Sequence, residues 1–401
     1  MTFVALEWLT FGLGRLASAA ENRGCDLTLL TSDASFYHRE LSALRSDALS
    51  VLRMDTSSVD QIRSYLSSIT DLEGLMNSTD TWSLMAVDLQ SQLGLPGPAP
   101  ASVRLARDKV SLRNRLYEAG LSRSPALRLD QANICAESLH TVKIPFIAKD
   151  SSGTGSRNVW AAFAPEDVPR IVEQVRTASL AGDLSVEPYF RGPLYSAETL
   201  TWHGETRLLG VTSRLLGKPP SFREDGLAFP CQMQATAVAE WITRVLEAIG
   251  YTDGFAHCEF ITTKDGFEIV EVNPRLGGMR IGEVMCRSLG VNIYDAFFDL
   301  ASGRRPGLMD LPLPVLSAWA EIAVYAPTAG SFVAINGQDV AREYPGQPDV
   351  AVLRRPGTQM PGTQNDRALV GSVLTSGPTT EIAMHNALSA SGELTCEMST
   401  P

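Results

Sequence analysis

Residues 257–259 read His-Cys-Glu and residues 271–278 read Glu-Val-Asn-Pro-Arg-Leu-Gly-Gly, and these two stretches decide the fold of the chain. Apolar runs lead into and out of Thr262-Thr263-Lys264-Asp265-Gly266, and Asp-Gly between two such runs is a hairpin signal. A turn centred on Asp265 places Glu259 opposite Glu271 and His257 opposite Asn273. Since side chains alternate between the two faces of a strand, all four are expected to share one face.

The predicted hairpin brings two carboxylates together. Glu259 and Glu271, with Cβ atoms about 5 Å apart, would repel each other unless a cation lies between them or they share a proton. With the amide oxygen of Asn273 they form a set of hard oxygen donors, which suits Mg²⁺ held jointly with substrate phosphates. The plain alternative is an exposed hairpin with solvated acids. Zinc is disfavoured because no cysteine or second histidine stands at metal-site spacing.

A Gly/Ser-rich loop follows a predicted strand. Residues 144–149 read Ile-Pro-Phe-Ile-Ala-Lys, residues 150–158 read Asp-Ser-Ser-Gly-Thr-Gly-Ser-Arg-Asn, and residues 159–162 form the expected return strand. Backbone N–H groups of such a loop can face phosphate oxygens. The loop lacks the Walker A spacing, and no helix follows it directly as dinucleotide binding requires. A flexible turn has the same composition, so the loop alone is weak evidence for phosphate binding. Lys149, directly before the loop, strengthens that interpretation.

A second lysine lies upstream. The pattern predicts a helix that begins after Asp108 as N-cap and stops at Gly120. Lys109 then lies in the first turn, where the helix dipole disfavours a cation by about 0.3–1 kcal/mol. Lys109 is either a solvated lysine or a side chain that points at a bound anion.

Five short motifs in this order resemble the ATP-grasp superfamily. They are Arg-Asp-Lys at 107–109, the strand and loop at 146–158, Val-Glu-Pro-Tyr-Phe at 186–190, Glu259, and Glu-Val-Asn-Pro-Arg at 271–275. More closely, they resemble the carboxylate–amine ligases, which include the L-amino acid (dipeptide) ligases. The implied fold is α/β with α+β sub-domains: a Rossmann-like pre-ATP-grasp domain, an ATP-grasp domain with a lid, and a small C-terminal domain.

The resemblance also implies roles for individual residues, with ATP and Mg²⁺ (or Mn²⁺) as cofactors. Arg275, Lys149 and Glu271 are the expected catalytic residues, and Glu259, Glu271 and Asn273 the expected metal ligands. The nucleotide would be bound by Lys109, Lys149, Ser152, Gly153, Thr154, Gly155, Ser156, Glu187, Pro188, Tyr189 and Phe190. Substrates would meet His257, Glu198, Gly277, Gly278 and Arg280.

The chain departs from the family pattern at two places. Related enzymes often carry a glutamate where Leu194 stands, and we expect Glu198 to compensate for it. Met279 and Arg280 follow the two glycines, where the family tends to have small or neutral residues. We expect Arg280 to grip a substrate carboxylate through two parallel hydrogen bonds; the alternative is that it pairs with a nearby acid such as Glu283.

His257 has two interpretations as well. It is either a general base or a polar neighbour that orients Glu259 or packs near the metals. No persuasive Ser-His-Asp or Cys-His set is present, which fits a chemistry that depends on charge neutralisation rather than on a nucleophilic side chain.

Composition predicts a multi-domain enzyme rather than a nucleic-acid binder. The chain has 401 residues, 44% of them hydrophobic, so two or three domains are expected. Its net charge of −11 argues against a general nucleic-acid surface. We expect domains at 1–100, 101–310 (with the lid at about 125–186) and 311–401, separated by Pro/Gly-rich segments near 94–100 and 304–314.

Targeting features are not expected. The six cysteines lack CxxC spacing, which suggests reduced thiols in a cytoplasmic protein. Residues 1–20 read as a strand and a helix rather than a secretory signal, because Glu7 precedes any positive charge. No run of about 18 uncharged apolar residues predicts a membrane helix.

The sequence therefore predicts an ADP-forming C–N ligase that joins a small-molecule carboxylate to an amine through an acyl phosphate, with at least one amino acid substrate. Other ATP-grasp chemistry, such as carboxylation through carboxyphosphate, and a non-catalytic nucleotide-binding protein are the alternatives. A homodimer is left open, and no nucleic-acid or membrane partner is expected.

Overall fold

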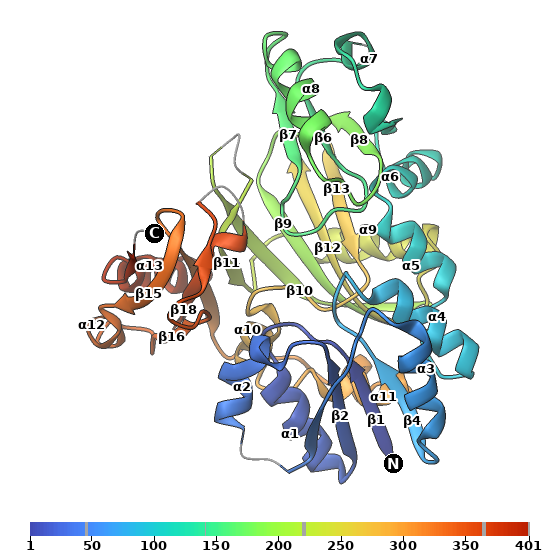
Figure 1. Cartoon of the computed structure of the whole chain (residues 1–401), viewed down its shortest axis with the longest axis vertical. Coiled ribbons are helices and arrows are strands. Elements are labelled where there is room, and N and C mark those ends of the chain that lie inside the picture. Colours follow the sequence, from blue (N-terminus) through green and yellow to red (C-terminus); the bar gives the residue numbers. More distant parts are fainter. Residues whose placement is uncertain (45–46, 141, 219–221, 363–365, 400–401) are drawn as a thin grey trace.

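The computed structural model describes residues 1–44, 47–140, 142–218, 222–362 and 366–399. Figure 1 shows an N-terminal part (blue), a lid at the opposite end (green), a central sheet between them and a C-terminal part (orange and red) to one side. None of the helices in the described ranges is both long enough and apolar enough to cross a membrane.

The N-terminal part is a parallel α/β domain, as predicted. Its sheet has the order β3-β2-β1-β4, and β1 pairs in parallel with both β2 and β4. The elements are β1 (Thr2–Leu6), α1 (Leu13–Arg23), β2 (Asp26–Thr31), α2 (His38–Ala43), β3 (Leu49–Arg53), α3 (Val59–Ser68), β4 (Leu72–Met76) and α4 (Ser83–Leu93).

Two later helices, α10 (Ile281–Leu289) and α11 (Asp295–Ala301), share a hydrophobic core with this domain, and α11 packs against β4. Phe298 meets Phe3 edge-on, with ring centroids 5.0 Å apart. Strand β4 approaches α11 so closely that a Cβ on Gly74 would lie 2.4 Å from the carbonyl oxygen of Ala301. The N-terminal domain and the residues that follow the 271–278 motif therefore share one hydrophobic core.

Two helices connect this domain to the lid. Helix α5 (Pro100–Arg107) has proline in its first turn, and α6 (Lys109–Glu118) begins at the predicted N-cap, where Asp108 accepts a hydrogen bond from the Ser111 amide at 2.8 Å. This cap places Lys109 at the start of α6.

The segment in which we expect the lid contains an antiparallel sheet in the order β5-β8-β6-β7. It has its own hydrophobic core. Its elements are β5 (Leu127–Leu129), α7 (Ala136–His140), β6 (Phe146–Asp150), β7 (Val159–Ala162), α8 (Asp167–Thr177) and β8 (Leu184–Pro188). The Gly/Ser loop joins β6 to β7.

The central sheet runs in the order β13-β12-β9-β10-β11-β14-β18-β16. The part that lies within the expected domain at 101–310 comprises β9 (Leu194–Trp202), β10 (Glu205–Leu216), β11 (Glu224–Phe229), α9 (Ala235–Ala248), β12 (Gly254–Thr263) and β13 (Gly266–Asn273). Helix α9 covers one face through Val238, Ile242 and Val245.

The C-terminal part extends this same sheet, because β14 pairs with β11 and β18 pairs with β14. The predicted boundary near residue 310 thus falls just before a strand that continues the central sheet. The elements are β14 (Ala318–Tyr325), β15 (Gly330–Asn336), α12 (Gln338–Arg342), β16 (Asp349–Val352), β17 (Gln359–Met360), β18 (Leu369–Gly377), α13 (Thr380–Ser391) and β19 (Thr395–Ser399). Strands β17, β15 and β19 form a separate small sheet.

Candidate active site

The hairpin of β12 and β13 has the predicted pairing at its open end. Glu259 pairs with Glu271, and His257 pairs with Asn273. Near the turn, however, Thr263 pairs with Gly266, so the turn is centred between Lys264 and Asp265 rather than on Asp265. A bulge at Val270 restores the predicted pairing. The carbonyl oxygen of this bulged residue accepts a hydrogen bond from Lys149 at 3.1 Å.

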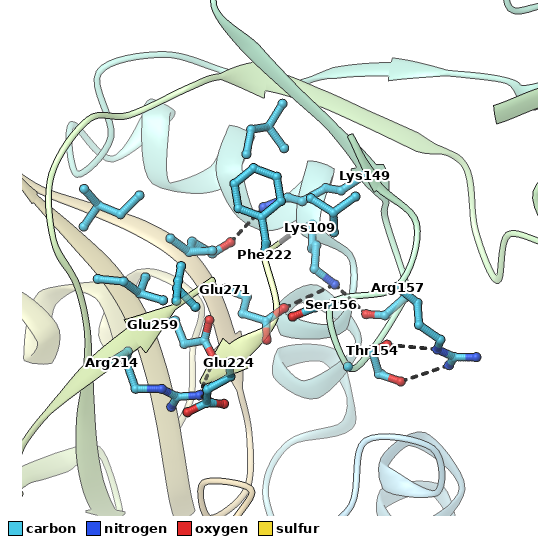
Figure 2. Close-up of a pocket in the computed structure, with 18 of the residues that line it drawn as sticks. Lys109, Lys149, Thr154, Ser156, Arg157, Arg214, Phe222, Glu224, Glu259 and Glu271 are labelled. Carbon is cyan, nitrogen blue, oxygen red and sulfur yellow. Dashed lines mark hydrogen bonds and ion pairs between the residues drawn. The ribbon is translucent and has the colours of Figure 1, made fainter. Parts of the chain in front are cut away.

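Each of the opposed carboxylates has its own cation. Arg214 Nη2 lies 3.6 Å from Glu259, and Lys109 Nζ lies 3.3 Å from Glu271. Figure 2 shows Glu259 and Glu271 near each other, with Arg214 on one side and Lys109 on the other. Two flanking cations therefore offset the repulsion between the carboxylates.

Glu271 is an ionised carboxylate at neutral pH. Burial opposes ionisation, but Lys109, a hydrogen bond from Asn273 Nδ2 at 2.8 Å, and Lys149 outweigh it and hold the pKa of Glu271 far below its ordinary value. An ionised carboxylate is the form that binds a divalent cation.

A large cavity of about 630 Å³ lies against this hairpin, between the lid and the central sheet. Most of the predicted site residues line it: Lys109, Lys149, Gly153, Thr154, Gly155, Ser156, Glu187, Pro188, Tyr189, Phe190, His257, Glu259, Glu271, Arg275 and Gly278. Five others lie outside its lining: Ser152, Glu198, Asn273, Gly277 and Arg280.

Lys149 forms a buried ion pair with Glu187, whose carboxylate also accepts a hydrogen bond from Arg113 Nε at 2.8 Å. Burial lowers the pKa of Lys149, and Glu187 opposes that shift. Arg113, four residues after Lys109 on α6, also lies 5.0 Å from the ring centre of Phe190. Residues 187–190 are therefore anchored to α6 as well as to the lid.

The Gly/Ser loop is tied to the start of α6. Lys109 donates its backbone N–H to the carbonyl of Ser151 at 2.9 Å and its ammonium to the carbonyl of Gly153 at 2.7 Å. Asp150 holds the base of the loop by accepting from the amides of Ser152, Ala181 and Gly182. Lys109 thus links the loop directly to Glu271.

Arg275 reaches the cavity wall from the segment after β13. Its guanidinium pairs with Asp80, in the loop after β4, and donates to the carbonyl of Leu276 at 2.8 Å. Asp80 also lies 3.2 Å from Arg107 Nη1. The N-terminal domain therefore contributes a carboxylate next to the expected catalytic arginine.

His257 lies among charged groups. Its Nδ1 is 2.9 Å from the carboxylate of Glu198, and its Nε2 is 3.0 Å from Arg214 Nη1 and 3.3 Å from Glu259 Oε1. Burial alone would lower its pKa, but the two carboxylates raise it to about 9. The contact with Arg214, which can only donate, opposes this rise in pKa, because it is satisfied by a neutral ring with Nε2 as acceptor. In the protonated ring and in the neutral ring alike, Nδ1 donates to Glu198. This supports the role of His257 in orienting Glu259 over a role as general base.

Glu198 lies behind His257 rather than on the cavity wall. It is 1% exposed and accepts hydrogen bonds from Ser196 Oγ at 2.7 Å and Thr212 Oγ1 at 3.0 Å. Leu194 lines the cavity itself. The predicted contact between Glu198 and a substrate is therefore not supported. The hydrogen bond between Glu198 and His257 Nδ1 indicates instead that Glu198 fixes the imidazole ring.

Arg280 is engaged elsewhere. Its guanidinium pairs with Asp349 of β16, and its backbone N–H donates to Glu321 at 3.0 Å. Glu283, the partner that the alternative named, instead binds Arg15 and Arg287. This arrangement does not support a substrate role for Arg280, because its side chain is committed to the C-terminal part.

The two glycines serve different ends. A Cβ on Gly277 would lie 2.9 Å from His257 Nδ1, so this position lets the chain pass close to the imidazole. Gly278 lines the cavity, and a Cβ there would meet no atom within 4 Å. The backbone thus passes close to another group at Gly277, and that group is the His257 side chain of the protein rather than a ligand.

Other cavity residues carry no local sequence signal. Arg214 of β10 and Glu224 of β11 pair with each other, and Phe222, Tyr325 and Leu369 add apolar surface. They come from strands that meet only in the folded sheet. Arg113 is the exception, since its i+4 spacing from Lys109 on a predicted helix indicates a shared face.

Residues 106–279 match the model of the ATP-grasp domain, and residues 322–399 match the model of L-amino acid ligase C-terminal domain 2. The chain belongs to the L-amino acid ligase-like family of ATP-grasp proteins. This membership confirms the family inferred from the motifs and the predicted class, the ADP-forming carboxylate–amine ligases. The C-terminal match begins within β14, the strand that extends the central sheet.

The chain is also similar to two curated proteins and to one solved structure. The uncharacterized protein y4rH of Sinorhizobium fredii is 26% identical over 344 residues, covering 82% of this chain and 69% of that protein. Human carnosine synthase 1 is 24% identical over 267 residues, covering 60% of this chain and 32% of the human protein. The chain thus spans about a third of the length of that synthase.

The solved structure is that of an L-amino acid ligase from Bacillus licheniformis. It superposes with a TM-score of 0.83 at 18% identity, covering 100% of this chain and 99% of the ligase. This likeness confirms the ATP-grasp fold.

ATP and a divalent metal are used throughout this family. Among the described residues, no three His, Cys, Asp or Glu side chains gather into a self-sufficient metal site. Two carboxylates beside an amide instead form an incomplete set of oxygen donors, which Mg²⁺ completes with phosphate oxygens and water.

Proposed function

We propose that this chain joins the carboxylate of one small molecule to the amine of another, at least one of them an amino acid, and releases ADP and phosphate. The reaction would run through an acyl phosphate. ATP would phosphorylate the carboxylate, and the amine would then displace phosphate and form an amide.

One observation carries the proposal. Glu259 and Glu271 face each other on neighbouring strands, and the same cavity is lined by Lys109, Lys149 and Arg275. Phosphoryl transfer requires positioning and charge neutralisation more than it requires a nucleophilic side chain. This cavity gathers cations around two carboxylates.

Each step of this reaction is assigned to particular residues of the cavity. Lys149 and Lys109 would bind the phosphates of ATP, and the 151–158 loop would cover them. Residues 187–190 would bind the adenine. Arg275 would stabilise the charge on the transferring phosphoryl group and on the acyl phosphate.

Glu259, Glu271 and Asn273 would hold Mg²⁺, which when bound would neutralise phosphate charge. His257, fixed by Glu198, would orient Glu259. The proximity of Arg214 to both His257 and Glu259 supports this role.

The composition of the cavity supports an amino acid as a substrate. Arg214 and Glu224 place opposite charges beside an apolar surface made by Phe222, Met279 and Tyr325. An amino acid presents a carboxylate, an ammonium group and a side chain at once, and this wall offers a group for each.

The test is a screen of ADP release with Mg²⁺–ATP and pairs of amino acids and small organic acids. An ¹⁸O-labelled acid should deliver one label to inorganic phosphate. Release of AMP and pyrophosphate would reject the mechanism, and ADP release that requires bicarbonate would indicate carboxylation. Tight ATP binding without turnover over a broad panel would indicate a non-catalytic protein.

A further inference from the structure

A carboxylate from the N-terminal domain lies against the active site. Asp80 follows β4, in the loop that leads into α4, and it pairs with Arg275, which is 195 positions later in the chain. Its other oxygen lies 3.2 Å from Nη1 of Arg107, at the end of α5. Asp80 is thus the shared counter-ion of two arginines.

The three charged groups are shielded from solvent. The side chains of Asp80, Arg275 and Arg107 are 11%, 12% and 10% exposed. Burial opposes the ionisation of Asp80, but the two arginines outweigh it and lower its pKa. Since removing one partner of a buried ion pair leaves an uncompensated charge, the loss of Asp80 would leave two neighbouring guanidiniums without a shared anion.

The loop that carries Asp80 is held in place by hydrogen bonds within the N-terminal domain. Asn77 donates to the carbonyl of Leu6, at the end of β1, at 2.7 Å and accepts from the amide of Thr79 at 3.1 Å. Ser83 Oγ donates to the carbonyl of Asp80 at 2.8 Å. The position of the carboxylate is therefore set by the N-terminal sheet.

Arg275 is fixed from two sides. One terminal nitrogen pairs with Asp80, and the other donates to the carbonyl of Leu276 at 2.8 Å. A planar guanidinium with both terminal nitrogens committed has little freedom to rotate. Of the hydrogen bonds that its side chain makes with the described residues, the contact with Leu276 would remain without Asp80.

Arg107 extends the contact to the lid. It donates to the carbonyl of Ser152 at 3.4 Å, and two residues later Lys109 binds Gly153 and Glu271. Asp80 therefore contacts the phosphoryl-binding side of the cavity through Arg275, and it contacts the Gly/Ser loop through Arg107.

We propose that Asp80 is a positioning residue that aims Arg275 into the cavity and makes turnover depend on the docked N-terminal domain. The inference rests on the proposed function, because it concerns the arginine that would stabilise the phosphoryl group. A misplacement of such a group by about 1 Å costs on the order of 10²-fold in rate.

The first test is Asp80→Asn, which keeps the shape of the side chain and removes its charge. We expect kcat for ADP release to fall about 10- to 100-fold, with the KM for ATP nearly unchanged. Asp299→Asn is the matched control, because Asp299 pairs with Arg23 across the same domain interface at 2.7 Å and lies outside the cavity lining. An equal loss of kcat in both variants would show that general domain docking is responsible, and would overturn the proposal.

Asp80→Glu is a second variant that keeps the charge and moves it. If Asp80 positions Arg275, the kcat of Asp80→Glu should lie between those of the wild type and Asp80→Asn. If Asp80 only stabilises the domain interface through its charge, Asp80→Glu should have wild-type turnover. A raised KM for one organic substrate at unchanged kcat would make Asp80 a direct substrate ligand and would also overturn the proposal.

A double-mutant cycle with Arg275→Lys separates this inference from the proposed function. If Asp80 acts through Arg275, its substitution should cost little in the Arg275→Lys background; additive losses would refute the coupling. Wild-type turnover of Arg275→Lys would instead refute the role of Arg275 in the proposed mechanism. Hydrogen exchange in residues 273–279 of the ligand-free protein should accelerate in Asp80→Asn and not in Asp299→Asn. This measurement needs no substrate, and unchanged exchange in Asp80→Asn would overturn the positioning role.

Discussion

Replacing Glu271 with glutamine should remove most turnover and leave the fold intact. The carboxylate lies 3.3 Å from Lys109 Nζ, which at an effective dielectric constant of about 20 corresponds to an attraction of about 5 kcal/mol before desolvation is subtracted. Glutamine retains an oxygen that can accept from Asn273, and Lys109 retains its hydrogen bond to Gly153. The substitution takes the carboxylate partner away from Lys109 but also relieves the repulsion from Glu259, so the loss of folding stability is smaller than that attraction.

The cost to catalysis is larger. With one anion removed, the site would bind the divalent cation less well, and several kcal/mol of phosphoryl charge stabilisation depend on that cation. We expect kcat to fall at least about 10²-fold, which corresponds to about 2.7 kcal/mol. The Mg²⁺ concentration needed for half-maximal rate should rise as well.

The assay is ADP release at saturating substrates over a Mg²⁺ titration, with thermal unfolding as the measure of folding. Glu283→Gln is the control, since Glu283 is paired with Arg15 and Arg287 and lies outside the cavity lining. It should lose stability and keep its turnover. A folded Glu271→Gln protein with near-normal ADP release and an unchanged Mg²⁺ requirement would refute the metal assignment.

Three further predictions follow from named contacts. The 151–158 loop should exchange its amide hydrogens more slowly when Mg²⁺–ATP is saturating; unchanged exchange would count against closure over the phosphates. Arg280→Met should lower the melting temperature, because it removes one of the arginines paired with Asp349, which keeps Arg287, and removes the positive charge beside the buried Glu321. It should leave every KM nearly unchanged; a raised KM for one organic substrate would return Arg280 to the site. The arginines around Glu283 outweigh its burial and lower its pKa from 4.5 to about 2. A depressed carboxylate pKa stabilises the fold above pH 4.5, and the contribution, about 3 kcal/mol, should disappear as the pH falls toward 2. Glu283→Gln should flatten this acid limb of the unfolding free energy; an unaltered limb would contradict the assignment.

Much of the site could be predicted because its signals are local. Alternation along two strands and a short turn were enough to pair Glu259 with Glu271, and a capping aspartate was enough to begin α6 at Lys109. The turn itself was placed half a residue away from its observed centre. The bulge at Val270 compensated for that error, and nothing in the local pattern predicted it.

The sequence by itself determined the ATP-grasp family, the parallel N-terminal domain, the lid and the order of the chemical motifs, because each depends on residues that are neighbours in the chain. Only the tertiary structure decided which charges meet. Asp80 reaches Arg275, Asp349 takes Arg280, and Arg214 joins His257 to Glu259. These partners stand on different elements, and a buried charge pairs with whichever opposite charge the packing of sheets and helices brings within a few ångströms.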